Sequence, residues 1–302
     1  MPRYRFRALI ALIIAALMFC TPVHAAERTI DSLYGPVKLN GAPQRVVALG
    51  ENALDAALSL GVQPVGALAS RGGTDVPDYL KEKAGNISLV GTVREPSLEA
   101  VLALQPDLIL ASAELPKAQY DRLNLIAPTV VPKGGSFQDW RKTYAIYAEA
   151  LGKQDQGQQR VEEIDARLAT MRERLTDHPQ VSVIRWNPQG PFIMSSQLFV
   201  GQLLDSIGFK PNDLSTQTKK PHTDILSLEN LDKADAEWIF LATLNADGRK
   251  ALEEARQQPA FSRLNAVKND HVVTVDGQVW SSSSGYLAAQ RVLDDVEKAL
   301  LD

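Results

Sequence analysis

The sequence contains one cysteine, Cys20, and four histidines among 302 residues. Cys20 lies in an N-terminal segment with the features of a signal peptide, so we expect a mature chain without cysteine. Such a chain has no disulfide, thiolate nucleophile, iron–sulfur cluster or structural zinc–thiolate site. Without His24, the remaining histidines are His178, His222 and His271, and their wide separation in the sequence disfavours a three-histidine metal cage.

An apolar run near the N-terminus is too short to cross a membrane. Residues 2–7 are basic, residues 8–19 are apolar, and small residues follow at 23–25. About 20 apolar residues are needed to span a bilayer, and this run has 12. The pattern predicts a signal peptide over residues 1–25, cleaved after Ala25. Lipid attachment at Cys20 is disfavoured because the preceding residue, Phe19, is bulky.

Signatures of common catalytic sites are absent as well. The sequence has no G-x-S-x-G elbow, phosphate-binding loop, G-x-G-x-x-G or H-E-x-x-H motif. A serine run at 281–284 has no neighbouring histidine to act as a base, so an extracytoplasmic hydrolase is the least favoured function. Removal of the signal peptide changes the formal net charge from −4 to −7, because it takes away three arginines. This acidic body argues against nucleic acid as a partner.

Short β-branched runs alternate with helical patterns from residue 45 onward, which indicates an α/β fold with parallel sheets. In the first half we expect strands at 46–49, 65–68, 108–111 and 129–131. The helices expected between them cover 54–60, 98–104 and 115–126. In the second half we expect strands at 181–185, 192–194, 238–242 and 272–275. A closing helix is expected from about 284 to 300, and the chain length predicts two lobes.

One amphipathic helix is expected between the halves, over about 155–177. Apolar residues at positions 161, 164, 168, 171 and 175 form a single stripe. Asp155 and Gln158 resemble an N-cap pair, and Pro179 ends the pattern. At 1.5 Å per residue the helix is roughly 33 Å long, so it acts as a rigid strut. The expected organisation is a signal peptide (1–25), an N-terminal lobe (26–153), the helix (154–178) and a C-terminal lobe (179–302).

Two internal repeats suggest that the lobes are duplicated. Ser97-Leu98-Glu99 returns 130 residues later as Ser227-Leu228-Glu229, and each copy leads into an expected strand. Residues 60–64 (LGVQP) are likewise similar to residues 207–211 (IGFKP). The two matches occur in the same chain order, which favours repetition over chance.

Several of these segments together resemble a known family. Residues 43–49 (PQRVVAL), 60–66 (LGVQPVG), 90–99 (VGTVREPSLE) and 104–109 (LQPDLI) are similar to the N-terminal lobe of the periplasmic binding proteins for iron–siderophore complexes and vitamin B12. Residues 275–280 and 291–294 are similar to the end of that family's C-terminal lobe. The ferrichrome and ferric citrate binders have the most similar pattern.

The resemblance implies a class III periplasmic binding protein. Its fold would be two Rossmann-like parallel-sheet lobes joined by one long α-helix, with a shallow ligand cleft between them. Its function would be to capture a ferric siderophore in the periplasm, as a monomer without a cofactor, and to deliver it to the permease dimer of an ABC importer in the inner membrane.

In parallel sheets of this kind, ligands bind beyond the carboxyl ends of the strands. The expected cleft residues of the first lobe are Glu51, Arg71, Arg94 and Glu114. Those of the second lobe are Trp186, Lys219, Lys220, His222, Thr243 and Trp280. Arginines bind carboxylate, catecholate or hydroxamate oxygens, and indole rings cover the apolar face of a ligand. Solvated loop positions for the charged residues, and a core position for Trp186, are the alternatives.

The sequence departs from the family at one cationic position. The ferrichrome and ferric citrate binders have an arginine two residues after the glycine that corresponds to Gly91. This chain has Val93 there and Arg94 one residue later. If the strand continued, Arg94 would face away from the cleft. The class of siderophore is therefore left open.

Two other ligands fit the same fold. Haem would need an axial ligand, for which Tyr79 and His222 are the candidates. Cobalamin would suit an aromatic cleft, for which Trp186 and Trp280 are available.

The resemblance also implies a role for the repeated glutamates. In this family such glutamates stand one on each lobe and pair with arginines of the importer's membrane subunits, so Glu99 and Glu229 are expected to dock the transporter. The alternative is that each stabilises the N-terminus of a helix, an effect of about 0.3 to 1 kcal/mol.

Overall fold

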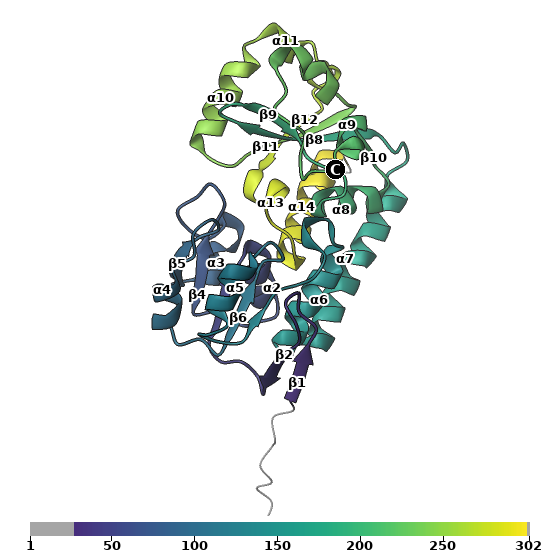
Figure 1. Ribbon diagram of the computed structural model, residues 1–302. Helices are drawn as coiled ribbons and strands as arrows, with labels where there is room; N and C mark the ends of the chain where they lie inside the picture. Colours follow the sequence, from purple (N-terminus) through teal and green to yellow (C-terminus); the bar gives the residue numbers. More distant parts are fainter. Residues whose placement is uncertain (1–26, 301–302) are drawn as a thin grey trace, which may run out of the picture.

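The structure is a computed structural model, and it describes residues 27–300. The expected signal peptide, with Cys20 and the cleavage site, lies outside the described residues. The described chain forms two α/β lobes, one at each end of the molecule in Figure 1. A short antiparallel hairpin, β1 (Glu27–Ile30) and β2 (Val37–Asn40), precedes the first lobe.

The first lobe is built on a five-stranded parallel sheet with the order β5-β4-β3-β6-β7. The strands are β3 (Val46–Leu49), β4 (Gly66–Ala69), β5 (Ser88–Thr92), β6 (Leu108–Ala111) and β7 (Thr129–Val130). The helices are α2 (Glu51–Ser59), η1 (Asp78–Leu80), α3 (Lys81–Ala84), α4 (Leu98–Ala103), α5 (Lys117–Leu123), η2 (Gly135–Phe137) and α6 (Trp140–Ala150). Every residue of β3 and β6 is buried, because helices cover both faces of the sheet.

The second lobe has four parallel strands in the order β10-β8-β11-β12, and a fifth strand, β9, pairs with β8. The strands are β8 (Gln180–Asn187), β9 (Gly190–Ile193), β10 (Lys210–Pro211), β11 (Trp238–Thr243) and β12 (Val272–Asp276). The helices are α8 (Phe199–Ile207), α9 (Asp213–Gln217), η3 (Leu228–Ala234), α10 (Ala246–Arg256), α11 (Pro259–Ser262), α12 (Asn265–Lys268), α13 (Gly277–Ser281) and α14 (Tyr286–Leu300).

One strand of the second lobe differs from the sequence-based expectation. The run at 192–194 was expected to be a parallel strand, but β9 is antiparallel to β8, with Asn187 opposite Gly190. Only two residues separate these two strands, whereas a parallel pair needs a crossover of a dozen residues or more. The short connection therefore makes a hairpin.

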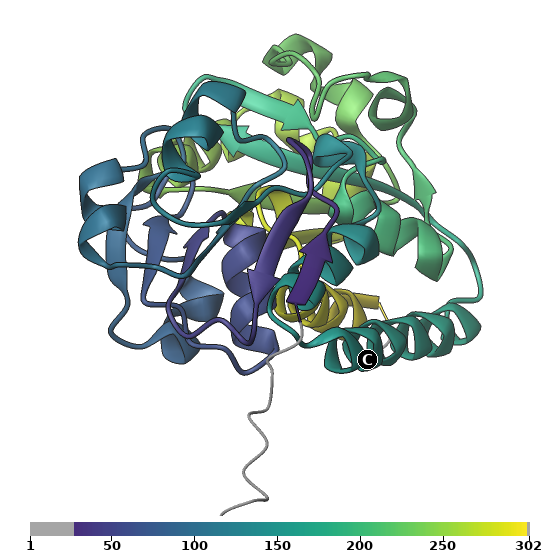
Figure 2. The ribbon, with the colours of Figure 1, turned by 60° about the horizontal axis from the view of Figure 1, so that its bottom comes forward.

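The long helix α7 (Gln154–Arg174) runs along both lobes and lies beside α14 in both ribbon views (Figures 1 and 2). Its 21 residues correspond to about 32 Å. Ile164, Leu168 and Met171 are buried, as the apolar stripe predicts. The helix ends earlier than expected, because Leu175 already has an extended backbone.

A second connection between the lobes was not foreseen from the sequence. Helix α14 belongs to the end of the chain, yet it packs against α2 of the first lobe as well as against α7 and α8. Arg167 of α7 pairs with Asp294 (2.7 Å) and Glu297 (3.0 Å) of α14. Two helices therefore connect the lobes.

No helix within residues 27–300 is long and apolar enough to cross a bilayer. Over the same residues, no group of three or more His, Cys, Asp or Glu side chains could hold a metal ion.

Candidate ligand cleft between the lobes

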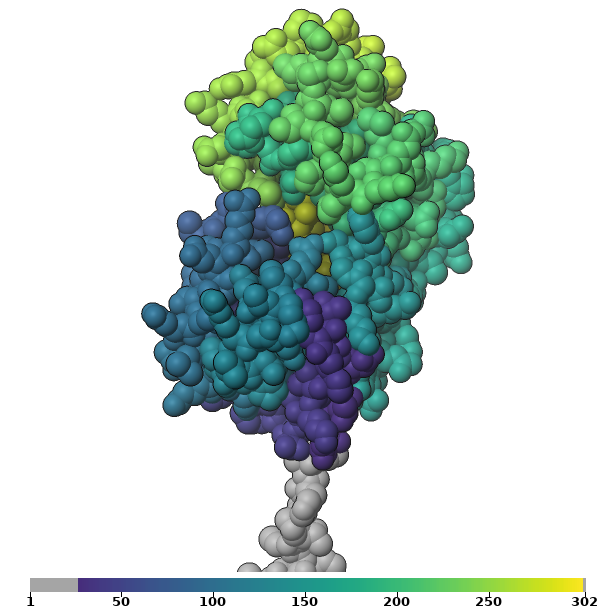
Figure 3. Space-filling view, in the orientation of Figure 1, coloured from purple at the N-terminus to yellow at the C-terminus, as the bar shows by residue number. Residues whose placement is uncertain are grey.

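A cavity of about 510 Å³ lies between the two lobes. In the space-filling view the molecule is hollowed at this level, and yellow atoms from the C-terminal part of the chain are visible inside the hollow (Figure 3). The first lobe contributes the residues that follow β3, β4, β5 and β6. The second lobe contributes residues of β8 and α8 and the serine run Ser281–Ser284.

Six of the ten expected ligand residues line this cleft: Glu51, Arg71, Arg94, Glu114, His222 and Trp280. The other four are absent from its lining: Trp186, Lys219, Lys220 and Thr243. The carboxyl ends of the first-lobe strands thus converge on the cleft, whereas most of the expected second-lobe residues lie elsewhere.

Arg71 is held between two carboxylates at the rim of the first lobe. Its backbone N–H donates to Glu51 Oε1 (2.7 Å), and its Nη2 atom lies 4.0 Å from Glu114 Oε2. Burial raises the pKa of Glu51, although the hydrogen bond and the charge of Arg71 oppose the shift. About half of the Arg71 side chain stays exposed, so its guanidinium remains accessible from the cleft.

Arg94 lies in a tight turn beyond the end of β5. Thr92 and Glu95 exchange two backbone hydrogen bonds of 3.1 Å, so Val93 and Arg94 form the tip of the turn. Both of these residues line the cleft. Because β5 ends at Thr92, the strict alternation of a strand no longer decides which side Arg94 faces.

Trp186 belongs to the core of the second lobe rather than to the cleft. Its side chain is 2% exposed and meets Phe261 edge-on, with ring centroids 6.2 Å apart. Successive residues of a strand point to opposite faces. Trp186 therefore faces one side of β8 and Arg185 the other.

The other expected residues that do not line the cleft are Lys219, Lys220 and Thr243. Lys220 pairs with Asp224 (3.2 Å), and both Lys219 and Lys220 are exposed. Thr243 is the last residue of β11, and Gly277 packs directly against its carbonyl group. A Cβ atom on Gly277 would lie 2.3 Å from Thr243 O. Tight packing thus closes this strand end.

Arg185 is the cleft residue that sequence reasoning missed. It is partly buried at the end of β8 and lines the cleft, with its guanidinium 5.2 Å from the ring of Phe192. Burial lowers the pKa of Arg185, and the positive charge of Arg71 lowers it further. Two arginines, one from each lobe, therefore repel each other across the cleft.

Several buried polar atoms around the cleft have no hydrogen-bond partner. They are Arg185 Nε, Trp140 Nε1, Ser282 Oγ and Ser283 Oγ, and all four residues line the cleft. An unpaired buried polar group costs about 1 to 3 kcal/mol. Among the described residues, four of the seven atoms of this kind therefore belong to residues that line the cleft.

Comparison with known proteins agrees with this architecture. The family model described as "Periplasmic binding protein" matches residues 46–279. The chain belongs to the periplasmic binding protein family. The protein named "Probable siderophore-binding lipoprotein" of Bacillus subtilis is 33% identical over 270 residues, which cover 86% of this chain and 83% of the relative.

Two further similar proteins are named or titled with a ligand of their own. The Fe(3+)-citrate-binding protein of Bacillus subtilis is 28% identical, over 90% of this chain and 85% of the relative. SirA of Staphylococcus aureus, solved in complex with staphyloferrin B, has a TM-score of 0.79 and 28% identity, with 91% of this chain and 98% of that chain covered.

Membership of this family indicates the general activity of the chain and the compartment in which its relatives act. Members are substrate-binding proteins and not enzymes, and the relatives act as periplasmic or lipid-anchored proteins on the outer side of the cytoplasmic membrane.

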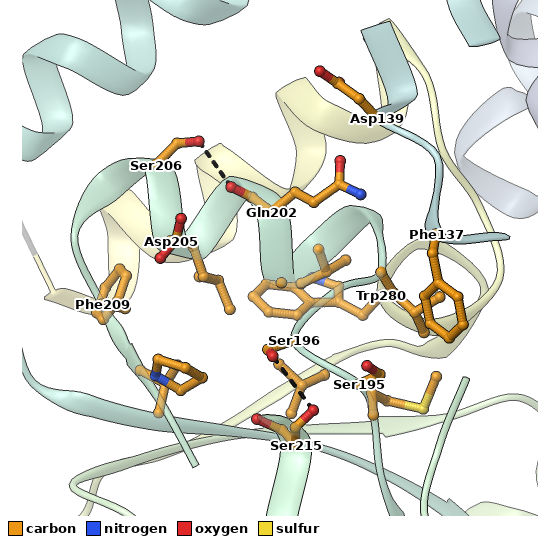
Figure 4. A pocket seen from close by; sticks show the side chains of 18 of the residues that line it. Phe137, Asp139, Ser195, Ser196, Gln202, Asp205, Ser206, Phe209, Ser215 and Trp280 are labelled. Carbon is orange, nitrogen blue, oxygen red and sulfur yellow. Dashed lines mark hydrogen bonds between the residues drawn. The ribbon is translucent and has the colours of Figure 1, made fainter. Parts of the chain in front are cut away.

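The binding protein has a second cavity, of about 450 Å³, lined mostly by its C-terminal lobe, with Phe137, Asp139 and Arg141 of the N-terminal lobe at one edge (Figure 4). Figure 4 shows Trp280 in the middle, with Asp139 and Gln202 on one side and Ser215 on the other. The wall that it shares with the cleft consists of Met194, Leu198, Val200 and Trp280. Its one cationic side chain, Arg141, is already bonded to Asp165 (2.9 Å). An anionic ligand is therefore better matched by the cleft.

Proposed function

We propose that this binding protein captures a ferric chelate with negatively charged oxygen donors in the cleft between its lobes and delivers it to an ABC importer. One observation carries the proposal: Arg71 and Arg185 approach the cleft from opposite lobes, and burial together with the positive charge of Arg71 lowers the pKa of Arg185. A ligand with negative oxygens between them would turn this repulsion into two charge-assisted hydrogen bonds.

The names of the relatives support an iron chelate. They refer to a siderophore, to Fe(3+)-citrate and to staphyloferrin B. Ser282 and Ser283 line the cleft, and rotation of their side chains turns hydroxyl donors toward the oxygens of such a ligand.

Haem and cobalamin are less well matched. Tyr79, one of two candidate axial ligands for haem, does not line the cleft, and its hydroxyl donates to Asp55 (3.1 Å). His222 lines the cleft, but its ring lies against the ring of Phe192, with centroids 4.3 Å apart. Its Nδ1 atom lies 2.7 Å from the backbone carbonyl oxygen of Thr223. Cobalamin would need an aromatic cleft, and Trp186 is in the core.

The direct test is fluorescence titration with ferric citrate, a ferric hydroxamate and a ferric catecholate. We expect at least one complex to quench emission, because Trp140 and Trp280 line the cleft. Trp280→Phe should reduce the quench, whereas Trp186→Phe should leave most of it, and the iron-free ligands give the background. Unchanged emission with all three complexes would contradict the proposal.

The proposal includes a periplasmic, monomeric mature chain formed by cleavage after Ala25. The bulky Phe19 before Cys20 supports cleavage by the general secretory route over lipid attachment. The lipoprotein relative from Bacillus subtilis represents the other arrangement.

Glu99 and Glu229 are proposed to dock the permease dimer. Both are exposed, and neither forms an ion pair with another of residues 27–300. Each stands beside an exposed leucine: Leu102, three residues after Glu99, is 59% exposed, and Leu228 is 38% exposed. A free charge next to exposed apolar surface is typical of a protein contact.

Because α7 and α14 both connect the lobes, we expect the lobes to move little relative to each other when the ligand binds. Bending α7 and α14 together would break the Arg167 ion pairs and the packing between these helices, so we expect the lobes to close by only a few degrees. Small-angle X-ray scattering curves with and without the ferric complex should nearly superimpose. A clear fall in the radius of gyration would show that the helices act as a hinge.

A further inference from the structure

A wholly buried carboxylate, that of Asp55, joins the two lobes. Asp55 lies in α2 of the first lobe, and its oxygens accept backbone N–H groups from the first turn of α14. Leu287 N donates to Oδ1 (3.0 Å) and Ala288 N donates to Oδ2 (2.8 Å). The Tyr79 hydroxyl also donates to Oδ2 (3.1 Å). The carboxylate thus serves as the cap of a helix that begins more than 200 residues later.

The capped turn is joined directly to the cleft. The serine run Ser281–Ser284 lines the cleft and is followed by Gly285 and the start of α14. On its other side, Gln278 donates to Ser70 Oγ (2.8 Å) and accepts from the backbone N–H of Asp78 (3.1 Å). First-lobe groups therefore hold the serine run at both ends.

The chain is shaped closely around the carboxylate. Gly285 has φ +138°, and a Cβ atom there would lie 2.4 Å from Asp55 Oδ1. Only glycine allows both this backbone conformation and this approach. The position of the serine run is thus set by contact with Asp55.

We propose that Asp55 is a positioning residue of the ligand cleft: it fixes the serine run at the place where the hydroxyls of Ser282 and Ser283 meet the ligand. This inference rests on the proposed function, because the hydroxyls matter only when a ligand occupies the cleft. Among the described residues Ser282 Oγ has no partner, and Ser283 lies against the Tyr79 hydroxyl that also bonds Asp55.

The position of the serine run should depend on pH near neutrality. Burial raises the pKa of Asp55 to about 7, although the hydrogen bonds from Leu287, Ala288 and Tyr79 lower it. The protonated acid has one oxygen fewer to accept with, so a donor of α14 loses its partner.

The phenols around Asp55 do not titrate in this range, whereas Glu51 is a second buried carboxyl group with a raised pKa, so the comparison with Asp55→Asn assigns the pH dependence to Asp55. Glu51 is on the same helix, and its charge is felt at Tyr79. From α6, Tyr144 has its pKa raised, chiefly by burial, with smaller effects of Asp55 and Arg160 of α7. Burial also holds the pKa of Tyr79 well above its ordinary value, so these phenols stay neutral near pH 7.

The test compares the mature chain with Asp55→Asn, which keeps the shape and removes the charge. We expect amide hydrogen exchange over residues 277–288 to become roughly tenfold faster, and the affinity for ferric citrate at pH 7.5 to fall roughly tenfold, as for the loss of one charged hydrogen bond. Between pH 6 and 8 the wild type should bind more tightly as the pH rises, and Asp55→Asn should lack this slope.

Asp235→Asn is the matched control. Asp235 also accepts two N–H groups at a helix start, from Asn265 (2.7 Å) and Ala266 (3.2 Å), but within the second lobe. This variant should leave the exchange of residues 277–288 and the ferric citrate affinity unchanged. Should Asp55→Asn not fold, the wild type still gives the answer, because protection of residues 277–288, corrected for intrinsic exchange, should increase as the pH rises through 7.

The outcomes separate the two proposals. Unchanged exchange of residues 277–288 in Asp55→Asn, or in the wild type across this pH range, overturns the positioning role whatever the ligand is. Faster exchange with wild-type affinity and slope for ferric citrate overturns the link to binding. Failure of the wild type to bind any ferric complex would contradict the proposed function. In that case the exchange of residues 277–288 still shows whether Asp55 holds this segment in place.

Discussion

Replacing Arg185 with alanine is expected to weaken binding of the ferric chelate by about 10- to 150-fold, the equivalent of one charged hydrogen bond of about 1.5 to 3 kcal/mol. The reason is its place at the end of β8: it is partly buried, its Nε atom has no partner, and it faces Arg71 of the other lobe. A ligand anion would meet both guanidinium groups. Affinity measured by fluorescence titration or calorimetry checks the prediction.

The same substitution should not destabilise the ligand-free chain. Burial and the charge of Arg71 both act against the protonated form of Arg185, so removing the charge relieves a repulsion that the empty cleft leaves uncompensated. We therefore expect the melting temperature of Arg185→Ala without ligand to equal or exceed that of the wild type. Stability given up at one position for the sake of binding is typical of a functional site.

Arg256→Ala is the control for Arg185→Ala. Arg256 also lies against a phenylalanine ring, that of Phe261 at 5.4 Å, but it pairs with Glu253 (3.4 Å) and does not line the cleft. Its loss should leave ligand affinity unchanged. Equal affinity of Arg185→Ala and the wild type would move the anion site away from β8, toward Arg71 and Arg94.

The double variant Glu99→Ala/Glu229→Ala is expected to lose most uptake in cells, by roughly tenfold for each charge pair lost, and to keep its ligand affinity. The two glutamates are exposed on different lobes, so neither substitution disturbs the cleft. Uptake of the radiolabelled iron complex and affinity of the purified protein are measured separately.

Helix capping, the alternative role of these glutamates, applies unequally to the two. Glu99 lies in the first turn of α4, where Ser97 already caps the helix through Ala100 N (3.2 Å). Glu229 lies in η3, a 3₁₀ helix of seven residues without a side-chain cap, so the expectation of two equivalent helix starts is not met. Capping predicts a small loss of stability, up to about 1 kcal/mol per site, and normal uptake.

A pair of glutamates elsewhere provides the control. Glu82 in α3 and Glu254 in α10 are exposed, one on each lobe. Glu82→Ala/Glu254→Ala should retain uptake. Equal uptake by both double variants would leave only the structural role for Glu99 and Glu229.

The sheets could be predicted from the sequence because burial on both faces leaves a plain signal. Residues 46–49 and 108–111 are continuous apolar runs, and the structure has strands at these positions. The stripe of α7 likewise gave Ile164, Leu168 and Met171 as its buried side.

The cleft residues of the second lobe could not be assigned in this way. Residues 181–184 are buried on both faces of β8, so the sequence has no alternation that tells which of Arg185 and Trp186 faces the cleft. Its large ring made Trp186 the expected cleft residue, but Arg185 is the one that lines the cleft. Asp55 gave no signal at all, because its partners are the backbone N–H groups of Leu287 and Ala288.

The dependence of Asp55 on residues near the C-terminus bears on how the chain is exported. A polypeptide threaded through the membrane from its N-terminus presents α2 long before Leu287 and Ala288 emerge. Until then, the carboxylate that is wholly buried in the finished protein has no helix to cap, and α2 lacks the packing of α14. If the proposed signal peptide directs export from the N-terminus, the first lobe therefore completes its core only after α14 has followed, near the end of translocation.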